Sequence, residues 1–321
     1  MKALVLKKIA LLEPEEIPPP PGPFLKINSC SICRTDAKMW QSGQRDLALP
    51  RIPGHEICVS DESGRSYVLW PGSACGKCRF CLEGRENLCP EMKILGFHTD
   101  GGFAEYVSAS PSSMIEVPES VKDLRTASLA EPLGCVLNSL DRHKFREKEK
   151  FLVCGAGTLG VMASYAAASS GAFVTLLEKN PAKIEKCRRL FKFPGSVEIT
   201  DNPEESFFDS ALNAAPGLDA FSSCLRMLGA RGSLLFFSGI TPSDAVIPAK
   251  TLNEIHYREL KLEGSYGCTL KNMKDALSLI AENETFFSSL IERTISLEQV
   301  EAVLPSVLSG DNFKFVIDPA L

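Results

Sequence analysis

The stretch that decides the fold is residues 151–160, FLVCGAGTLG. Four apolar residues suited to a buried strand lead into a turn with the pattern G-x-G-x-x-G, and a helical pattern follows. In such a turn Gly155 permits the tight reversal, Gly157 lets the backbone approach a pyrophosphate, and Gly160 lets the helix pack close to the strand. The stretch therefore predicts a dinucleotide-binding unit built on a parallel sheet.

The residues after this turn refine the prediction. The amides of Thr158 and Leu159 open the helix, where unpaired N–H groups bind phosphate. The next apolar run ends at Glu178, eighteen residues after Gly160. An acidic side chain at this place binds the adenosine ribose diol and repels a 2′-phosphate, so Glu178 favours NAD over NADP. The neighbouring Lys179 weakens that preference, and a glycine turn with an ordinary surface glutamate is the alternative interpretation.

Hydrophobic periodicity divides the chain into two parts. Up to about residue 135 it consists of short strand-like runs separated by Gly and Pro. Beyond that point apolar runs alternate with helical patterns, at 151–154, 159–169, 173–177, 182–190, 233–237 and 260–263. This alternation predicts a parallel sheet with helices on both faces. The predicted fold class is α/β, with a β-rich domain and a doubly wound parallel-sheet domain.

Composition restricts the possible partners. The chain has 321 residues, of which 44% are apolar and 23% charged, and its net charge is −5. A negative net charge argues against nucleic acid or an anionic membrane as a partner, and no apolar run approaches the roughly 20 residues of a membrane span. Lys7 and Lys8 interrupt the apolar start of the chain too early for a signal peptide. We expect a cytoplasmic protein that binds a small molecule.

Four of the twelve cysteines lie within fifteen residues, namely Cys75, Cys78, Cys81 and Cys89. Four thiolates satisfy tetrahedral zinc completely and leave no open position, so such a site is structural. Local disulfides or an iron–sulfur cluster are the alternatives. The spacing favours a structural zinc lobe at about residues 72–92.

A second set of possible metal ligands is spread along the chain and consists of Cys33, His55, Glu56 and Glu131. Taken singly, Cys33 could be a buried thiol or half of a redox pair with Cys30, His55 a core histidine, and Glu131 a charge at a helix start. Together, one thiolate, one imidazole and one carboxylate with an open position are typical of catalytic zinc. The sequence leaves open whether Glu56 or Glu131 supplies the carboxylate.

These motifs resemble, in order along almost the whole chain, those of the zinc-containing medium-chain alcohol, polyol and threonine dehydrogenases. They are C-x2-C-R-T-D at 30–36, G-H-E at 54–56, the four-cysteine lobe, G-G-F-A-E-Y-V at 101–107, E-P at 131–132 and G-A-G-T-L-G at 155–160. The resemblance implies a GroES-like catalytic domain of residues 1–134 and 267–321, with a Rossmann domain of residues 135–266 inserted. It also implies one structural and one catalytic zinc ion per chain, and a homodimer or homotetramer.

The resemblance assigns roles around the second set of ligands. Cys33 and His55 would bind the catalytic zinc. Glu56 matches the third protein ligand of the polyol relatives, whereas Glu131 stands where other branches place a second cysteine ligand. Asp36 would accept a hydrogen bond from the His55 ring and so orient it.

Thr35 and four cationic residues complete the site that the resemblance implies. Thr35 would hydrogen-bond the substrate oxygen and relay its proton, Arg34 would contact the pyrophosphate, and Lys183 would lie over the adenine ribose. Lys314 occupies a position that often contacts the pyrophosphate, and a solvated lysine at a strand end is the equal alternative. Lys38 departs from the family pattern, because many relatives have there the histidine that passes the proton to solvent. A lysine can do this only if its pKa falls from about 10.4. Otherwise Lys38 is an exposed cation or a substrate anchor.

We therefore expect a zinc-dependent enzyme that oxidises a secondary alcohol or polyol to the ketone with NAD. One rival is a zinc-free quinone or enoyl reductase on the same scaffold, which would lack the ligand set and the cysteine lobe. Another rival is a non-enzymatic, zinc-stapled NAD-binding redox sensor, which has no need of an open zinc site. The sequence does not identify the alcohol.

Overall fold

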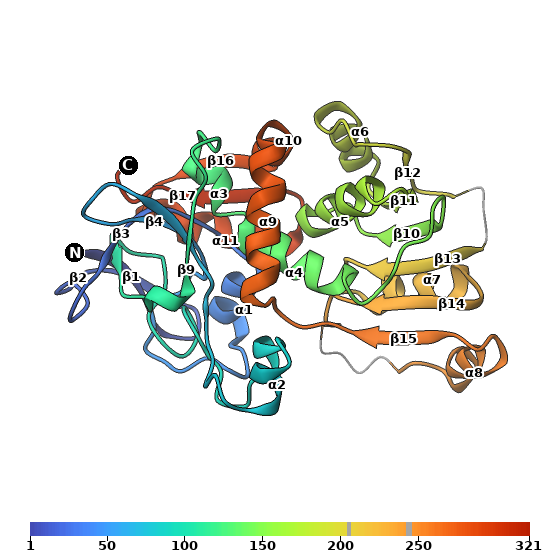
Figure 1. Cartoon of the computed structure of the whole chain (residues 1–321), viewed down its shortest axis with the longest axis horizontal. Helices are drawn as coiled ribbons and strands as arrows, with labels where there is room; N and C mark the ends of the chain where they lie inside the picture. Colours follow the sequence, from blue (N-terminus) through green and yellow to red (C-terminus); the bar gives the residue numbers. More distant parts are fainter. Residues whose placement is uncertain (204–206, 242–245) are drawn as a thin grey trace. The chain divides into compact units, whose positions relative to one another are not determined.

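The computed structural model describes residues 1–203, 207–241 and 246–321 (Figure 1). The chain divides into two compact units. Unit 1 consists of Met1–Gly134 and Cys268–Leu321, and unit 2 is the continuous segment Cys135–Gly267. Each unit is built on a large sheet of its own.

Unit 2 is built on six parallel strands in the order β12-β11-β10-β13-β14-β15. These strands are β10 (Lys150–Cys154), β11 (Phe173–Leu177), β12 (Val197–Thr200), β13 (Phe208–Asn213), β14 (Leu228–Phe236) and β15 (Lys261–Gly264). The strand order runs outward from β10 in both directions, which creates a switch point between β10 and β13. Doubly wound sheets bind ligands beyond the strand carboxyl ends at such a point. The predicted α/β, doubly wound fold class is thus confirmed.

Helix α5 (Thr158–Ser169) begins directly at the glycine turn and is almost fully buried. Gly160 is necessary for this packing, because a Cβ at this position would lie 1.8 Å from the carbonyl oxygen of Gly155. The other described helices of unit 2 are α6 (Pro181–Leu190), α7 (Leu218–Met227) and α8 (Ala249–Tyr257). Helix α5 packs on β10 and β11, and helix α7 packs on β10, β13 and β14.

Unit 1 is built on a mainly antiparallel sheet in the order β16-β17-β3-β4-β5-β9, with β8 also paired to β3. These strands are β3 (Leu25–Ser31), β4 (Glu56–Ser60), β5 (Ser66–Leu69), β8 (Tyr106–Val107), β9 (Met114–Glu116), β16 (Ile291–Ile295) and β17 (Lys314–Ile317). Strand β17, from the end of the chain, lies beside β3, from its beginning (Figure 1). Both ends of the chain therefore contribute to one sheet.

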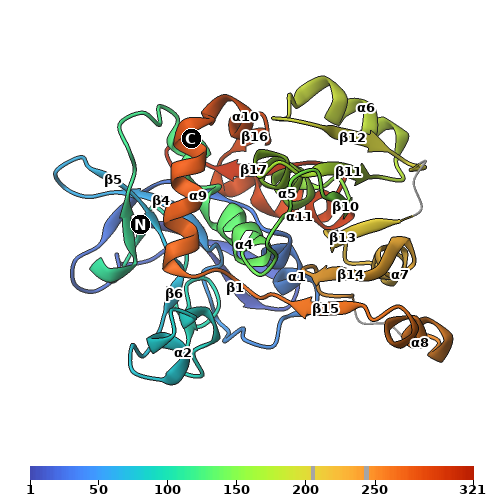
Figure 2. The same cartoon turned by 45° about the vertical axis from the view of Figure 1, so that its right-hand side comes forward.

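The remaining strands of unit 1 form two small sheets, which pair β1 (Lys2–Lys8) with β2 (Leu11–Glu16) and β6 (Gly72–Ser73) with β7 (Lys93–Ile94). Its helices are α1 (Arg34–Ser42), α2 (Arg79–Leu82), α3 (Leu124–Ala127), α9 (Leu270–Glu282), α10 (Glu284–Ser288) and α11 (Val300–Ser309), and α4 (Ala130–Leu140) continues across the boundary between the units. Helix α2 and its loops form a lobe set apart from the large sheet in both views (Figures 1 and 2). None of the helices in the described ranges is long and apolar enough to cross a membrane.

A buried carboxylate joins the loop before β10 to strand β13 within unit 2. Glu149 accepts hydrogen bonds from the Ser210 hydroxyl and from the Arg146 backbone N–H (3.1 Å), and it pairs with the His143 ring. Burial raises the pKa of Glu149, but these hydrogen bonds together lower it by more, so the net pKa lies below its ordinary value.

We expect Glu149→Gln to destabilise unit 2 at neutral pH by about 1.5–3 kcal/mol, as is typical for loss of hydrogen bonds to a charged group. Because the folded pKa is depressed, this contribution is present above the ordinary pKa of about 4.3 and is lost as the pH falls through the folded value. Denaturant unfolding of both proteins at about pH 7 and about pH 3 measures it. An equally large difference at the acid pH would show that the charge is not responsible.

Candidate functional site

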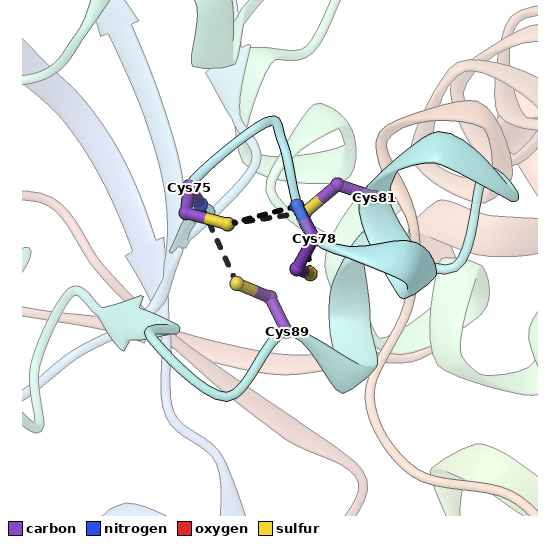
Figure 3. Close-up of side chains that lie close together, drawn as sticks. All are labelled: Cys75, Cys78, Cys81 and Cys89. Atoms are coloured by element: carbon purple, nitrogen blue, oxygen red, sulfur yellow. Dashed lines mark hydrogen bonds between the residues drawn. The ribbon is translucent and has the colours of Figure 1, made fainter.

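Four cysteines of unit 1 converge around helix α2, and their sulfurs lie within 4.8 Å of one another (Figure 3). The sulfurs of Cys75 and Cys81 are 4.0 Å apart, and those of Cys78 and Cys81 are 3.4 Å apart. Zinc–sulfur bonds of about 2.3 Å at tetrahedral angles separate the sulfurs by about 3.8 Å. The four thiols, with Cys89 as the fourth, therefore fit a structural zinc ion.

Backbone N–H groups prepare this cluster for a cation. The N–H of Cys78 donates to the Cys75 sulfur (3.3 Å), and the N–H of Cys75 donates to the Cys89 sulfur (3.4 Å). Hydrogen bonds from the N–H groups of Lys77 and Cys78 lower the pKa of Cys75 to about 7. A lower pKa favours the thiolate, which is the form that binds metal.

The cysteine lobe and its surroundings are also attached to the start of helix α9. The Glu86 carboxylate accepts a hydrogen bond from the Leu270 N–H (2.8 Å), and the Trp70 indole donates to the carbonyl oxygen of Cys268 (2.9 Å). Sequence reasoning missed both contacts, because they join residues 184 and 198 positions apart and belong to no local motif. They fix the segment at which the chain re-enters unit 1.

Cys33, His55 and Glu56 form a second cluster, in which one ligand atom of each lies within 4.8 Å of the others. Cys33 precedes α1 as its N-cap, and Glu56 is the first residue of β4. Gly54 has a φ of 94°, and a Cβ there would lie 2.6 Å from the Phe103 ring, so only glycine fits directly before His55. One thiol, one imidazole and one carboxylate make a three-ligand set of the kind found in catalytic zinc sites.

Asp36 connects the two segments that carry these ligands. Its Oδ2 atom accepts a hydrogen bond from the Cys33 N–H (2.8 Å), and its Oδ1 atom accepts one from the Gly54 N–H (3.2 Å). Oδ1 also lies 3.3 Å from Nδ1 of His55, which leaves Nε2 for a metal. Burial lowers the pKa of His55, but the charges of Asp36 and Cys33 outweigh this, so the net pKa is raised.

Lys314 meets the second cluster from the end of the chain. Its amino group donates to both carboxylate oxygens of Glu56 and to the carbonyl oxygen of Ile32 (3.2 Å). The Glu56 side chain is fully buried, and that of Lys314 is 7% exposed. Burial lowers the pKa of Lys314, but the Glu56 carboxylate raises it by more, so the lysine stays charged. The sequence analysis assigned Lys314 to the pyrophosphate and missed this pairing.

Glu131 lies in the first turn of α4 and is buried. Burial raises the pKa of Glu56, and the charge of Glu131 raises it further, so the two carboxylates are close enough to interact. Among the described residues, however, the cluster that contains Cys33 and His55 includes Glu56 and not Glu131.

Helix α1 carries the other residues predicted near this cluster. Arg34, Thr35 and Lys38 follow Cys33 along the first two turns and are all half-buried. The Nε atom of Arg34 is buried and has no hydrogen-bond partner in the described part of the chain. Burial and the neighbouring Arg34 charge lower the pKa of Lys38.

The predicted dinucleotide residues of unit 2 are also brought together. Gly157 caps α5, so Thr158, Leu159 and Gly160 form the first turn of that helix. The Glu178 carboxylate accepts hydrogen bonds from the N–H groups of Ala156 (3.0 Å), Lys179 (2.8 Å) and Asn180 (3.1 Å).

Lys183 lies against this same carboxylate. Its Nζ atom is 3.7 Å from Glu178 Oε2, and both side chains are largely buried. Asn180 caps α6 by accepting hydrogen bonds from the N–H groups of Ala182 and Lys183. The glycine turn, Glu178 and Lys183 therefore form one continuous surface at the carboxyl ends of β10 and β11.

Comparison with known proteins relates this chain to alcohol dehydrogenases. Residues 23–119 match the family model described as alcohol dehydrogenase GroES-like domain. L-galactonate-5-dehydrogenase of Escherichia coli (strain K12) is 29% identical over 279 residues, which are 81% of this chain and 80% of the relative. D-altritol 5-dehydrogenase of Agrobacterium fabrum (strain C58) is 28% identical over 300 residues, which are 88% and 87% of the two chains.

The fold is shared with solved structures. A protein from Sinorhizobium meliloti 1021, described as a zinc-binding dehydrogenase bound to NADP, superposes with a TM-score of 0.87 at 24% identity over 99% of each chain. Galactitol-1-phosphate dehydrogenase from Escherichia coli superposes with a TM-score of 0.88 at 20% identity, covering 99% of this chain and 100% of the other.

We expect Lys314→Met to be strongly destabilising, because it leaves the Glu56 carboxylate buried without its counter-charge. Removing one partner of a buried ion pair costs about 3–5 kcal/mol. The double variant Glu56→Gln/Lys314→Met should regain much of this loss, since neither charge remains. Denaturant unfolding of the wild type, both single variants and the double variant gives the four unfolding free energies of a double-mutant cycle. Additive effects of the two substitutions would contradict the pairing.

Proposed function

The chain belongs to the zinc-containing medium-chain alcohol dehydrogenase family, and on that premise we propose that it oxidises a secondary alcohol or polyol to the ketone with NAD. The observation that carries the proposal is the convergence of the Cys33, His55 and Glu56 ligand atoms within 4.8 Å. The names of two relatives support the substrate class, because one refers to a sugar acid, L-galactonate, and the other to a sugar alcohol, D-altritol.

Cys33, His55 and Glu56 would hold the proposed catalytic zinc. We assign Glu56 as the third ligand because, among the described residues, it shares a cluster with Cys33 and His55 whereas Glu131 does not. Three protein ligands leave one position for the substrate oxygen. When bound, the zinc ion stabilises negative charge on that oxygen as a Lewis acid.

The protein's own residues then orient the reactants and move the proton. Asp36 holds the Cys33 and His55 segments at a fixed separation through its two carboxylate oxygens. Lys314 balances the charge of Glu56. Thr35, in the first turn of α1, would relay the proton, because its hydroxyl can accept the proton of the substrate hydroxyl while it donates its own proton towards solvent. A bound NAD would supply the hydride acceptor, so the alcohol would lose a hydride from its carbinol carbon and the proton of its hydroxyl, two electrons and two hydrogens in all.

Elemental analysis should find two zinc ions per wild-type chain. Cys33→Ser should retain one zinc ion, keep its fold and lose turnover, because one ligand of the catalytic set is missing. Cys89→Ser is the matched variant at the other cluster, and it should lose the structural zinc and unfold at a lower temperature. One zinc ion in both the wild type and Cys33→Ser would contradict the proposal and favour the zinc-free reductase or the redox sensor.

The proposed preference for NAD depends on Glu178, whose carboxylate faces the glycine turn. A 2′-phosphate brought against this carboxylate is disfavoured, because juxtaposed like charges cost several kcal/mol. We expect Glu178→Ser to raise the NADP-to-NAD ratio of kcat/KM by about tenfold or more. Steady-state kinetics with both dinucleotides measure this ratio, and an unchanged ratio would remove Glu178 from the account of specificity.

We also propose that two chains associate through strand β15. All four residues of β15 are exposed, and β15 is the last strand of its sheet. An exposed edge strand can pair with a strand of another chain. Analytical ultracentrifugation should therefore give at least twice the mass of one chain, and a strictly monomeric protein would contradict this proposal.

A further inference from the structure

Helix α1 carries two cations that form no ion pair within the described part of the chain. Arg34 and Lys38 are four residues apart, so their side chains share one face of the helix. Like charges at this spacing destabilise a helix, and cations near its N-terminus oppose the helix dipole. Asp36 is the one acidic residue in the sequence of α1, and its carboxylate faces Cys33 and Gly54. Helix α1 therefore has excess positive charge that no acidic residue in the described part of the chain pairs with.

Lys38 lies in the second turn of α1, the helix whose N-cap residue is Cys33, and it is half-buried. Taking a cation partly out of water costs free energy unless an anion compensates it. Lys38 follows Cys33 by five residues, which is about 7.5 Å along a helix axis, so an anion bound to Lys38 would lie near the residue that carries a proposed metal ligand.

We propose that Lys38 binds a carboxylate of the substrate, so that the enzyme acts on polyhydroxy acids in preference to neutral polyols. This inference rests on the proposed function, since it concerns the substrate of the same site. The resemblance assigns Arg34 to the dinucleotide pyrophosphate, which leaves Lys38 for the substrate. A substrate held by its carboxylate at Lys38 and by its hydroxyl at the Cys33–His55–Glu56 cluster is fixed at two points. Two-point binding selects the carbon that loses the hydride.

The test compares hexonates with the hexitols of the same configuration by steady-state kinetics on the zinc-loaded enzyme with saturating NAD. The wild type should have the higher kcat/KM with a hexonate. Lys38→Gln should lower the hexonate-to-hexitol ratio of kcat/KM roughly 10- to 100-fold, mainly through KM, because a hydrogen bond between charged groups is lost. Lys38→Arg keeps the charge and should retain most of the ratio.

Arg34→Gln is the matched control, because it removes the same charge one helical turn away. It should raise the KM for NAD without changing the hexonate-to-hexitol ratio. An equal ratio in the wild type and Lys38→Gln would overturn the inference. Two other roles of Lys38 would give that result. If Lys38 carries the proton, Lys38→Gln shifts the pH profile of kcat with both substrates; if Lys38 contacts the cofactor, Lys38→Gln binds NAD more weakly.

Calorimetric titration of a hexonate into the enzyme with NADH keeps this test separate from the proposed function. Binding that is lost in Lys38→Gln and retained in Lys38→Arg supports the carboxylate site, even if no alcohol is oxidised. In that case the dehydrogenase proposal fails and the anion site stands. If instead hexitols are oxidised and the wild type and Lys38→Gln bind the hexonate equally well, the dehydrogenase proposal stands and the carboxylate site at Lys38 fails.

Discussion

The pairing of β17 with β3 is the constraint on which the candidate active site depends. It sets Val316 opposite Ser31 and Ile317 opposite Cys30, and so brings the end of the chain to the segment that leads into Cys33. Lys314, the first residue of β17, thereby reaches the Ile32 carbonyl and the Glu56 carboxylate. Without this strand pairing, Glu56 would be a buried carboxylate with no counter-charge, which is a strongly destabilising arrangement.

The charges around the second cluster explain why it suits a cation. Cys33, Asp36, Glu56 and Glu131 all contribute negative charge when ionised, and Asp36 and Glu56 are almost entirely buried. Lys314 balances part of this charge. The carboxylate oxygens of Asp36 accept hydrogen bonds from backbone N–H groups, and one of them also faces the His55 ring. A divalent ion between Cys33, His55 and Glu56 would supply the remaining positive charge. This charge balance supports the proposed metal ion at the Cys33 cluster.

Local motifs made most of the fold and part of the site predictable. The residues of the glycine turn with Glu178, and those of the four-cysteine lobe, lie close together in the sequence. Their spacing alone therefore restricts how these side chains can lie in space. Contacts between distant segments were not predictable in this way. The Glu56–Lys314 pair spans 258 residues and the Trp70–Cys268 contact spans 198, and both depend on strand and helix packing. A lysine within the apolar run Phe313–Ile317 was the one available signal, because a lysine in a buried strand needs an anionic partner.

The proposed function depends on whether a metal ion occupies the Cys33 cluster. Crystals of the purified protein, measured on both sides of the zinc absorption edge, would locate each zinc ion directly. We expect two anomalous peaks per chain, one among the four cysteines of the lobe and one bonded to Cys33, His55 and Glu56. A single peak among the four cysteines, with the Lys314–Glu56 pair intact and no metal beside it, would contradict the central claim.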